Sequence, residues 1–360
     1  MRARAALKLT DKGGKCQLCE GLTDKIAGLI YRHLSLIEAF EFSSVSLGII
    51  LPAHIINRED ELRASLKLKE PPTIKRYLAN VAIAELRSML GRPVMLSHIN
   101  ADVSLTLDFI TETVDIRASP IYLLGRYIKQ KRGIPLRTRE RVNTQSPSLE
   151  ALLERALVLH FGAEEAKFSW AGGEDKDSLV LGQGRPFVAK LTNPRRRTLP
   201  PTLINSINDE LGALGVGVTQ LEVLTSRPKL PFHYIFTAEI ACRLINSSAG
   251  ALTRFTGLSA FSSIDVLFER PGRPPKTRRL LSLGGFRLSD SELRMTGTFE
   301  GGFDIRAFFG REKESRAQPN AHQLLRTSLE LIHYDILEVK LLESALSLNS
   351  PFGVGLRAQE

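Results

Sequence analysis

Cysteine is scarce in this sequence, with three residues in a chain of 360. Three thiols cannot build a disulfide framework, so we expect a reducing compartment, the cytoplasm. Long hydrophobic runs are missing as well. The longest apolar stretch, residues 45–56, contains polar residues and a proline and is too short to span a bilayer. The N-terminal residues carry arginines and lack the apolar core of a secretory signal, so we expect no membrane segment.

A glycine-rich turn that follows a strand and opens a helix is also missing. Gly212, Gly215 and Gly217 lie between an expected helix at 201–214 and an expected strand at 216–224. A dinucleotide-binding turn needs the opposite order, with the strand first. This order argues against most nucleotide-dependent or S-adenosylmethionine-dependent enzymes.

The composition is that of a globular protein with an anionic partner. Hydrophobic residues make up 43% of the chain and charged residues 24%, and the formal net charge is +10. A length of 360 residues favours two or three domains. An excess of positive charge favours a polyanion such as a nucleic acid.

Helical and strand patterns alternate along the chain and predict an α+β fold. In the first part we expect helices at 21–40 and 73–90 and strands at 44–56, 102–110 and 113–116. After a polar, aperiodic stretch, Ser148 is expected to cap a further helix. Strands are then expected at 232–240, 263–268 and 331–341, with loops at 269–279 and 310–320. These patterns predict an accessory domain (1–140), a linker (141–148), a second domain (149–345) and a tail (346–360).

Two stretches could bind RNA. From Arg126 to Arg139 there are basic residues and no acidic one, and basic side chains reach phosphates while a tyrosine can stack on a base. Residues 168–197 combine two glycine turns, an acidic step and a run of three arginines. The alternative interpretation is a solvated basic edge and two ordinary loops around a strand. The candidate RNA contacts are Arg126, Tyr127, Lys129, Lys131, Arg132, Arg185, Lys190, Arg195, Arg196 and Arg197.

Three blocks resemble one known family. Residues 172–177 (GGEDKD) and 181–187 (LGQGRPF) are similar to the signature of the archaeal and eukaryotic tRNA pseudouridine synthases that modify the T-arm. That signature reads Gly-Arg-Glu-Asp-Val-Asp and then Leu-Gly-x-Gly-Arg-Pro-Phe. Residues 119–135 resemble a block of the family's THUMP-containing accessory domain, which grips tRNA. Residues 300–307 resemble its Glu-Gly-Gly-Leu-Tyr-Ile-Lys-Glu block.

The resemblance implies a pseudouridine synthase fold and the isomerisation of uridine to pseudouridine in tRNA. Asp175 matches the catalytic aspartate, and Tyr234 matches the tyrosine that stacks on the extruded base. Ile305 matches a residue of the apolar pocket wall, and Arg306 matches the basic partner of the aspartate. Such chemistry needs no cofactor, the implied partner is tRNA, and we expect a monomer.

Some positions depart from the family pattern. Gly173 replaces an arginine, and Asp304 replaces a residue that is usually aromatic. Cys16 and Cys19 form half of a structural zinc site, but the second cysteine pair is missing where the family carries it, at 136–141. The alternative hypothesis is therefore a tRNA-binding protein on the same fold that has lost catalysis. A THUMP-bearing methyltransferase or sulfur-transferase would need a cofactor loop or a reactive cysteine, and neither is present.

Overall fold

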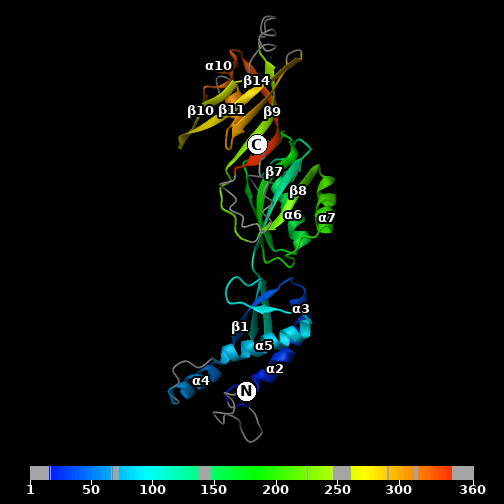
Figure 1. Cartoon of the computed structure of the whole chain (residues 1–360), viewed down its shortest axis with the longest axis vertical. Coiled ribbons are helices and arrows are strands. Elements are labelled where there is room, and N and C mark those ends of the chain that lie inside the picture. Colours follow the sequence, from blue (N-terminus) through cyan, green and yellow to red (C-terminus); the bar gives the residue numbers. More distant parts are fainter. Residues whose placement is uncertain are drawn as a thin grey trace, which may run out of the picture. The chain divides into compact units, whose positions relative to one another are not determined.

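The chain forms two compact units in the computed structural model (Figure 1). The structure describes residue 16 and residues 18–65, 67, 73–137, 147–224, 226–245, 261–289, 292–311 and 315–342. Most of the predicted linker and the whole predicted tail lie outside these residues. The first unit comprises Met1–Ile121, Val158–Glu165 and Leu191–Thr198, and the second comprises Tyr122–Leu157, Ala166–Lys190 and Leu199–Glu360.

The first unit is a four-stranded sheet with helices packed against it. The strand order is β2-β1-β3-β4, in which β1 runs parallel to both of its neighbours and β4 is antiparallel to β3. The helices are α2 (Leu22–Arg32), α3 (Leu34–Glu38), α4 (Ala53–Ser65) and α5 (Ile74–Leu90), and the strands are β1 (Ser44–Ile50), β2 (Met95–Leu96), β3 (Val103–Asp108) and β4 (Thr113–Ala118).

One face of this sheet is buried under α2 and α5, which pack against each other. Buried and more exposed residues alternate along β3 and β4, as expected for strands with one covered face. The side chain of Thr73 accepts a hydrogen bond from the amide of Arg76 and caps α5, and Gly91 ends that helix in the left-handed conformation. The predicted α+β character is confirmed.

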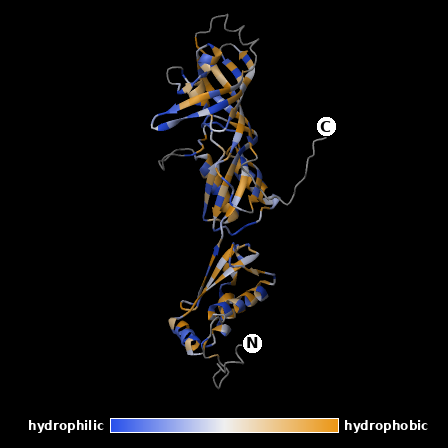
Figure 2. Cartoon of the chain, turned by 60° about the vertical axis from the view of Figure 1, so that its left-hand side comes forward, coloured by the Kyte–Doolittle hydropathy of each residue, from blue (hydrophilic) through white to orange (hydrophobic). Residues whose placement is uncertain are grey.

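The strand predicted at 44–56 is too long. It ends at Ile50, and residues 53–65 form α4 instead. Ile55 is the only residue of α4 that is buried. Figure 2 shows hydrophilic residues mixed with hydrophobic ones in this helical region of the first unit. The helix was missed because it has no apolar stripe, which is the signal that sequence periodicity provides.

The second unit is built on a ten-stranded sheet. The strand order is β13-β10-β11-β12-β9-β14-β7-β5-β8, and β6 pairs with β7. The strands are β5 (Ile121–Lys129), β6 (Glu165–Trp170), β7 (Val180–Thr192), β8 (Val216–Leu224), β9 (Tyr234–Leu244), β10 (Phe261–Arg270), β11 (Arg273–Ser289), β12 (Glu292–Glu300), β13 (Ala317–Gln318) and β14 (Leu329–Leu341), and the helices are α6 (Leu149–Phe161), α7 (Pro201–Gly212), α9 (Ile305–Phe309) and α10 (Ala321–Leu325).

Helix α7 packs on β8 (Figure 1), and Arg155 of α6 forms an ion pair with Glu210 of α7 at 3.0 Å. The hydroxyl of Ser148 accepts a hydrogen bond from the amide of Ala151, so the predicted cap of α6 is confirmed. The apolar residues Leu149, Leu152, Leu153, Ala156 and Leu157 are all buried. None of the helices in the described ranges is long and apolar enough to cross a membrane.

Two boundaries differ from the prediction. Strand β5 was assigned to the accessory domain, but it lies between β7 and β8 in the sheet of the second unit. Residues 269–279 were predicted as a loop, but a turn at 271–272 joins β10 to β11 in a hairpin. The prolines at 274 and 275 are tolerated because β12 pairs with β11 only from Leu280 onwards. Among the described residues, one side of residues 273–279 therefore has no strand partner.

Candidate active site

Asp175 lies in the loop between β6 and β7, and its carboxylate forms an ion pair with Arg306. The Asp175 side chain is 28% exposed, so a ligand can reach it. Arg306 is the second residue of α9, a short helix capped by Asp304, whose carboxylate accepts a hydrogen bond from the amide of Ala307 at 3.1 Å. The hydrogen bond that Arg306 donates to Asp175 raises the pKa of Arg306. The structure thus brings two of the predicted site residues together, and Ile305 is buried beside them at the start of α9.

Tyr234 reaches the same loop because Gly172 has no side chain. A Cβ at Gly172 would lie 2.0 Å from the Tyr234 hydroxyl oxygen, and Gly172 has a φ of +79°. Tyr234 is the first residue of β9 and is 8% exposed, and its carbonyl accepts a hydrogen bond from the amide of Gly301 at 2.8 Å. Tyr234 therefore lies between the loop that carries Asp175 and the turn that leads to Arg306.

A fully buried group of charged residues lies beneath this loop. Glu174 faces Lys129 at 3.4 Å and Arg185 at 3.3 Å, and its Oε2 accepts a hydrogen bond from the Tyr127 hydroxyl at 2.6 Å. Burial lowers the pKa of Lys129, which Glu174 partly offsets, and burial and Glu174 raise the pKa of Tyr127. Arg185 donates to the carbonyl of Ala171 at 2.9 Å, so this group supports both ends of the loop.

Three predicted RNA contacts are therefore wrong. Tyr127 and Lys129 are 0% exposed and Arg185 is 2% exposed, so none of them can reach a phosphate or a base. Lys129 and Arg185 both face Glu174 instead, since a buried charge requires a partner. The basic pattern could not distinguish a buried cation from an exposed one.

Three residues between 129 and 133 donate hydrogen bonds to three consecutive carbonyl groups of the loop that carries Asp175. Lys129 Nζ donates to the carbonyl of Asp175 at 2.9 Å, and the amide of Gly133 donates to that of Lys176 at 2.9 Å. Arg132 donates a hydrogen bond to the carbonyl of Asp177. It also forms a bidentate ion pair with Asp335, with distances of 2.6 and 2.7 Å between the guanidinium nitrogens and the carboxylate oxygens. Arg132 was predicted to bind RNA, but its guanidinium is engaged in fixing the loop.

Asp335 and Tyr334, both on β14, were not predicted as site residues. Asp335 also accepts a hydrogen bond from the amide of Leu179 at 2.8 Å. Burial raises the pKa of the Tyr334 hydroxyl, which forms a hydrogen bond with the backbone of Asp175. The sequence offers no signal for either residue, because both read as ordinary positions of a closing strand.

The remaining candidate RNA contacts are dispersed. Arg126 donates to the carbonyls of Gly184 and Val339, both at 2.9 Å, while Lys131 is exposed and Lys190 is half-buried. In the first unit, Arg195 is exposed and Arg196 faces Glu41 at 3.7 Å. Arg197 donates to the carbonyl of Ser119 at 2.7 Å and faces Asp102 at 3.4 Å, so it has a structural role.

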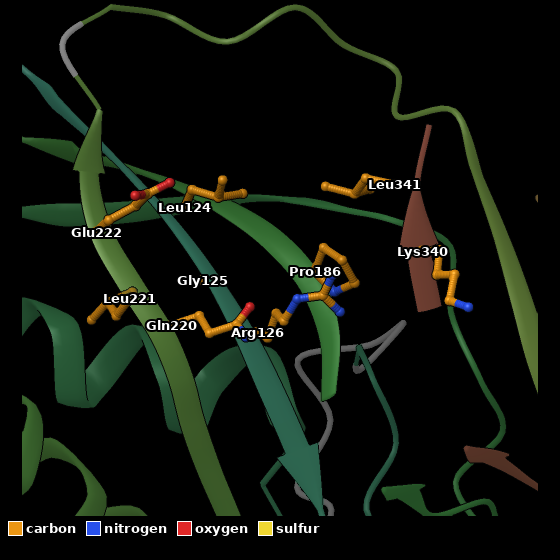
Figure 3. A pocket seen from close by; sticks show the side chains of 9 residues that line it. All are labelled: Leu124, Gly125, Arg126, Pro186, Gln220, Leu221, Glu222, Lys340 and Leu341. Carbon is orange, nitrogen blue, oxygen red and sulfur yellow. The ribbon is translucent and has the colours of Figure 1, made fainter. Parts of the chain in front are cut away.

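Three cavities of the second unit are lined by residues predicted to belong to the active site or to contact RNA. Arg126 lines one of about 630 Å³, where Figure 3 shows its side chain beside Pro186 and Gln220. Asp175 is not among the residues that line it. Asp175 and Arg306 instead line two other cavities, of about 1020 Å³ and about 310 Å³. The smaller of these also contains Ser178, whose buried hydroxyl has no hydrogen-bond partner among the described residues.

The residues present do not fit the zinc site of the resembled family. Cys19 is buried and Cys16 is half-buried, at the start of the described chain. Over the residues that the structure describes, no group of three or more His, Cys, Asp and Glu side chains is placed to hold a metal ion. Two thiolates alone do not complete the tetrahedral coordination of a structural zinc.

Comparisons with known proteins agree with the geometry. Residues 122–230 match the profile of the family described as "Pus10, C-terminal". The chain is 30% identical over 361 residues to the tRNA pseudouridine synthase Pus10 of Korarchaeum cryptofilum, covering 92% of this chain and 94% of that protein. It is 26% identical to the Pus10 of Nitrosopumilus maritimus, covering 91% of this chain and 86% of the relative. The chain therefore belongs to the Pus10 family of tRNA pseudouridine synthases and has the fold of that family.

Proposed function

We propose that this protein is a tRNA pseudouridine synthase that isomerises one or both of uridines 54 and 55 in the T-arm. The observation that carries the proposal is the Asp175–Arg306 ion pair, which lines cavities open to a ligand and has Tyr234 packed against the same loop. The relatives that cover the chain almost completely carry the name tRNA pseudouridine synthase, which supports the assignment.

In the proposed reaction, the target nucleotide first leaves the base stack, because its glycosidic bond is otherwise inaccessible. Asp175 initiates cleavage of the bond between N1 of uracil and C1′ of ribose, acting as nucleophile or base. The detached uracil rotates and a bond forms between its C5 and C1′, which releases the carboxylate wherever Asp175 had bonded to C1′. The proton that C5 loses is matched by the proton that N1 gains, so the product is an isomer of the substrate. Arg306 orients the carboxylate through the ion pair between the two side chains.

The second candidate is a tRNA-binding protein without catalysis. Gly173 and Asp304 favour it, because both depart from the family pattern near the site. The intact ion pair between Asp175 and Arg306 argues against it, since a binding protein has no need of this pair.

The proposal is tested with an unmodified tRNA transcript and the full-length protein. Pseudouridine is mapped by carbodiimide labelling and primer extension, and we expect stops at uridine 54, uridine 55 or both. A parallel transcript with cytidine at both positions should give no product. Binding of the transcript without any pseudouridine would favour the second candidate.

A further inference from the structure

The larger cavity beside Asp175 is bordered by the hairpin of β10 and β11. Its volume is about 1020 Å³, and a neighbouring cavity of about 460 Å³ continues along the same hairpin. Both are lined by Arg270, Arg273 and Arg316, and Arg306 joins them in the larger one. Four guanidinium groups thus surround the approach to the catalytic carboxylate.

Two of these four arginines form ion pairs with carboxylates of the described residues, and the other two do not. Arg306 binds Asp175, and Arg270 binds Asp304 at 2.8 Å. Within the described ranges, neither Arg273 nor Arg316 has an ion pair or a side-chain hydrogen bond. Glu269 is the one remaining acidic residue in the lining of the larger cavity. The two unengaged cations are therefore available to an anionic ligand, which a guanidinium binds through paired hydrogen bonds.

The hairpin itself carries further positive charge. Lys276, Arg278 and Arg279 follow Arg273 on β11, and residues 273–277 are all exposed. Figure 2 shows the projecting end of this hairpin mostly in hydrophilic colours. An exposed basic hairpin next to an arginine-lined cavity suits a strand of nucleic acid that enters from solvent.

Asp304 fixes the side chain of Arg270 in the lining of the larger cavity. Its Oδ1 caps α9, and its Oδ2 binds Arg270. The residue that departs from the family pattern therefore connects the helix of Arg306 to the hairpin.

We propose that this cavity binds the RNA phosphates that flank the reacting nucleotide, through Arg273 and Arg316, with Arg270 positioned by Asp304. The inference rests on the proposed function, because it takes Asp175 as the place where the nucleotide reacts. Arg273 and Arg316 are backbone contacts and read no base, so they supply affinity rather than sequence preference.

The test measures binding of an unmodified tRNA transcript by Arg273→Gln, Arg316→Gln and the double variant, across a series of KCl concentrations. Arg287→Gln is the matched control, because Arg287 is an exposed arginine on the same strand that lines none of the cavities described above. Each cavity variant should bind about 3- to 10-fold more weakly, and the slope of log K against log salt should become shallower by about 0.7 per arginine removed. In turnover, the loss should appear mainly as a higher KM.

Equal affinities and equal salt slopes for the wild type and the double variant would overturn the proposal. So would an equal loss in Arg287→Gln, because the effect would then come from net charge alone. If the wild type forms no pseudouridine but the binding differences appear as expected, the cavity assignment stands and the enzymatic assignment fails.

Discussion

At the residue scale, the site depends on contacts between side chains that are far apart in the sequence. Asp175 and Arg306 come from a loop and a short helix, and Tyr234 comes from the start of β9. Gly172 is the residue that lets Tyr234 approach the loop of Asp175, because the Tyr234 hydroxyl occupies the space where the Cβ of residue 172 would be. Its positive φ is also one that glycine adopts without cost.

Gly172→Ala should therefore disable the site. The added methyl group would displace the Tyr234 ring or the loop by about 1 Å, and a shift of this size costs roughly 100-fold in rate. The measurement is kcat on a tRNA transcript, with thermal unfolding to register the strain. Gly173→Ala is the matched control. That position has no positive φ, and the added Cβ would meet only the flexible end of Leu136. Near-normal activity in Gly172→Ala would contradict this role.

At the element scale, the end of β5 and the residues after it support the loop that carries Asp175. Lys129, Arg132 and Gly133 bind three successive loop carbonyls, and Lys129 also balances the buried Glu174. The basic pattern of this segment predicted an RNA contact, because charge in a sequence carries no information about burial. Periodicity predicted most of the strands, and the residue type at position 148 predicted the cap of α6. The pairing of Asp175 with Arg306 was expected from the resemblance of two sequence blocks to the family. Helix α4 and the part of hairpin β10–β11 at residues 269–279 could not be predicted, because neither segment shows an apolar period.

Lys129→Met should test this support. Removing one partner of a buried ion pair leaves Glu174 with less compensation and releases the carbonyl of Asp175, so we expect a loss of about 3–5 kcal/mol in the free energy of unfolding. Urea unfolding measures the loss, and kcat should fall with it because the loop is no longer fixed. Lys131→Met is the control. This exposed neighbour should change stability by no more than about 0.5 kcal/mol. Equal stabilities of the two variants would show that the buried lysine does not hold the loop.

At the scale of the whole molecule, the chain consists of two units, and only one of them carries the residues assigned to the reaction. All the residues assigned here to the chemistry belong to the second unit, and the first contains the small sheet with α2 and α5. Of the predicted RNA contacts in the first unit, Arg197 is engaged with Asp102 and Ser119, whereas Arg195 is exposed. In the proposed function, the reaction depends first on Asp175, and the roles assigned to the other residues follow from that assignment.

The most direct measurement is pseudouridine formation in a tRNA transcript by the wild type and by Asp175→Asn, with the affinity of both proteins for the transcript determined in parallel. Asparagine keeps the size of the side chain but lacks the negative charge and the basicity that the reaction requires. We expect product from the wild type, a loss of at least about 100-fold with Asp175→Asn, and similar affinities. Comparable rates of product formation by the two proteins would contradict the assignment of Asp175 as the catalytic residue.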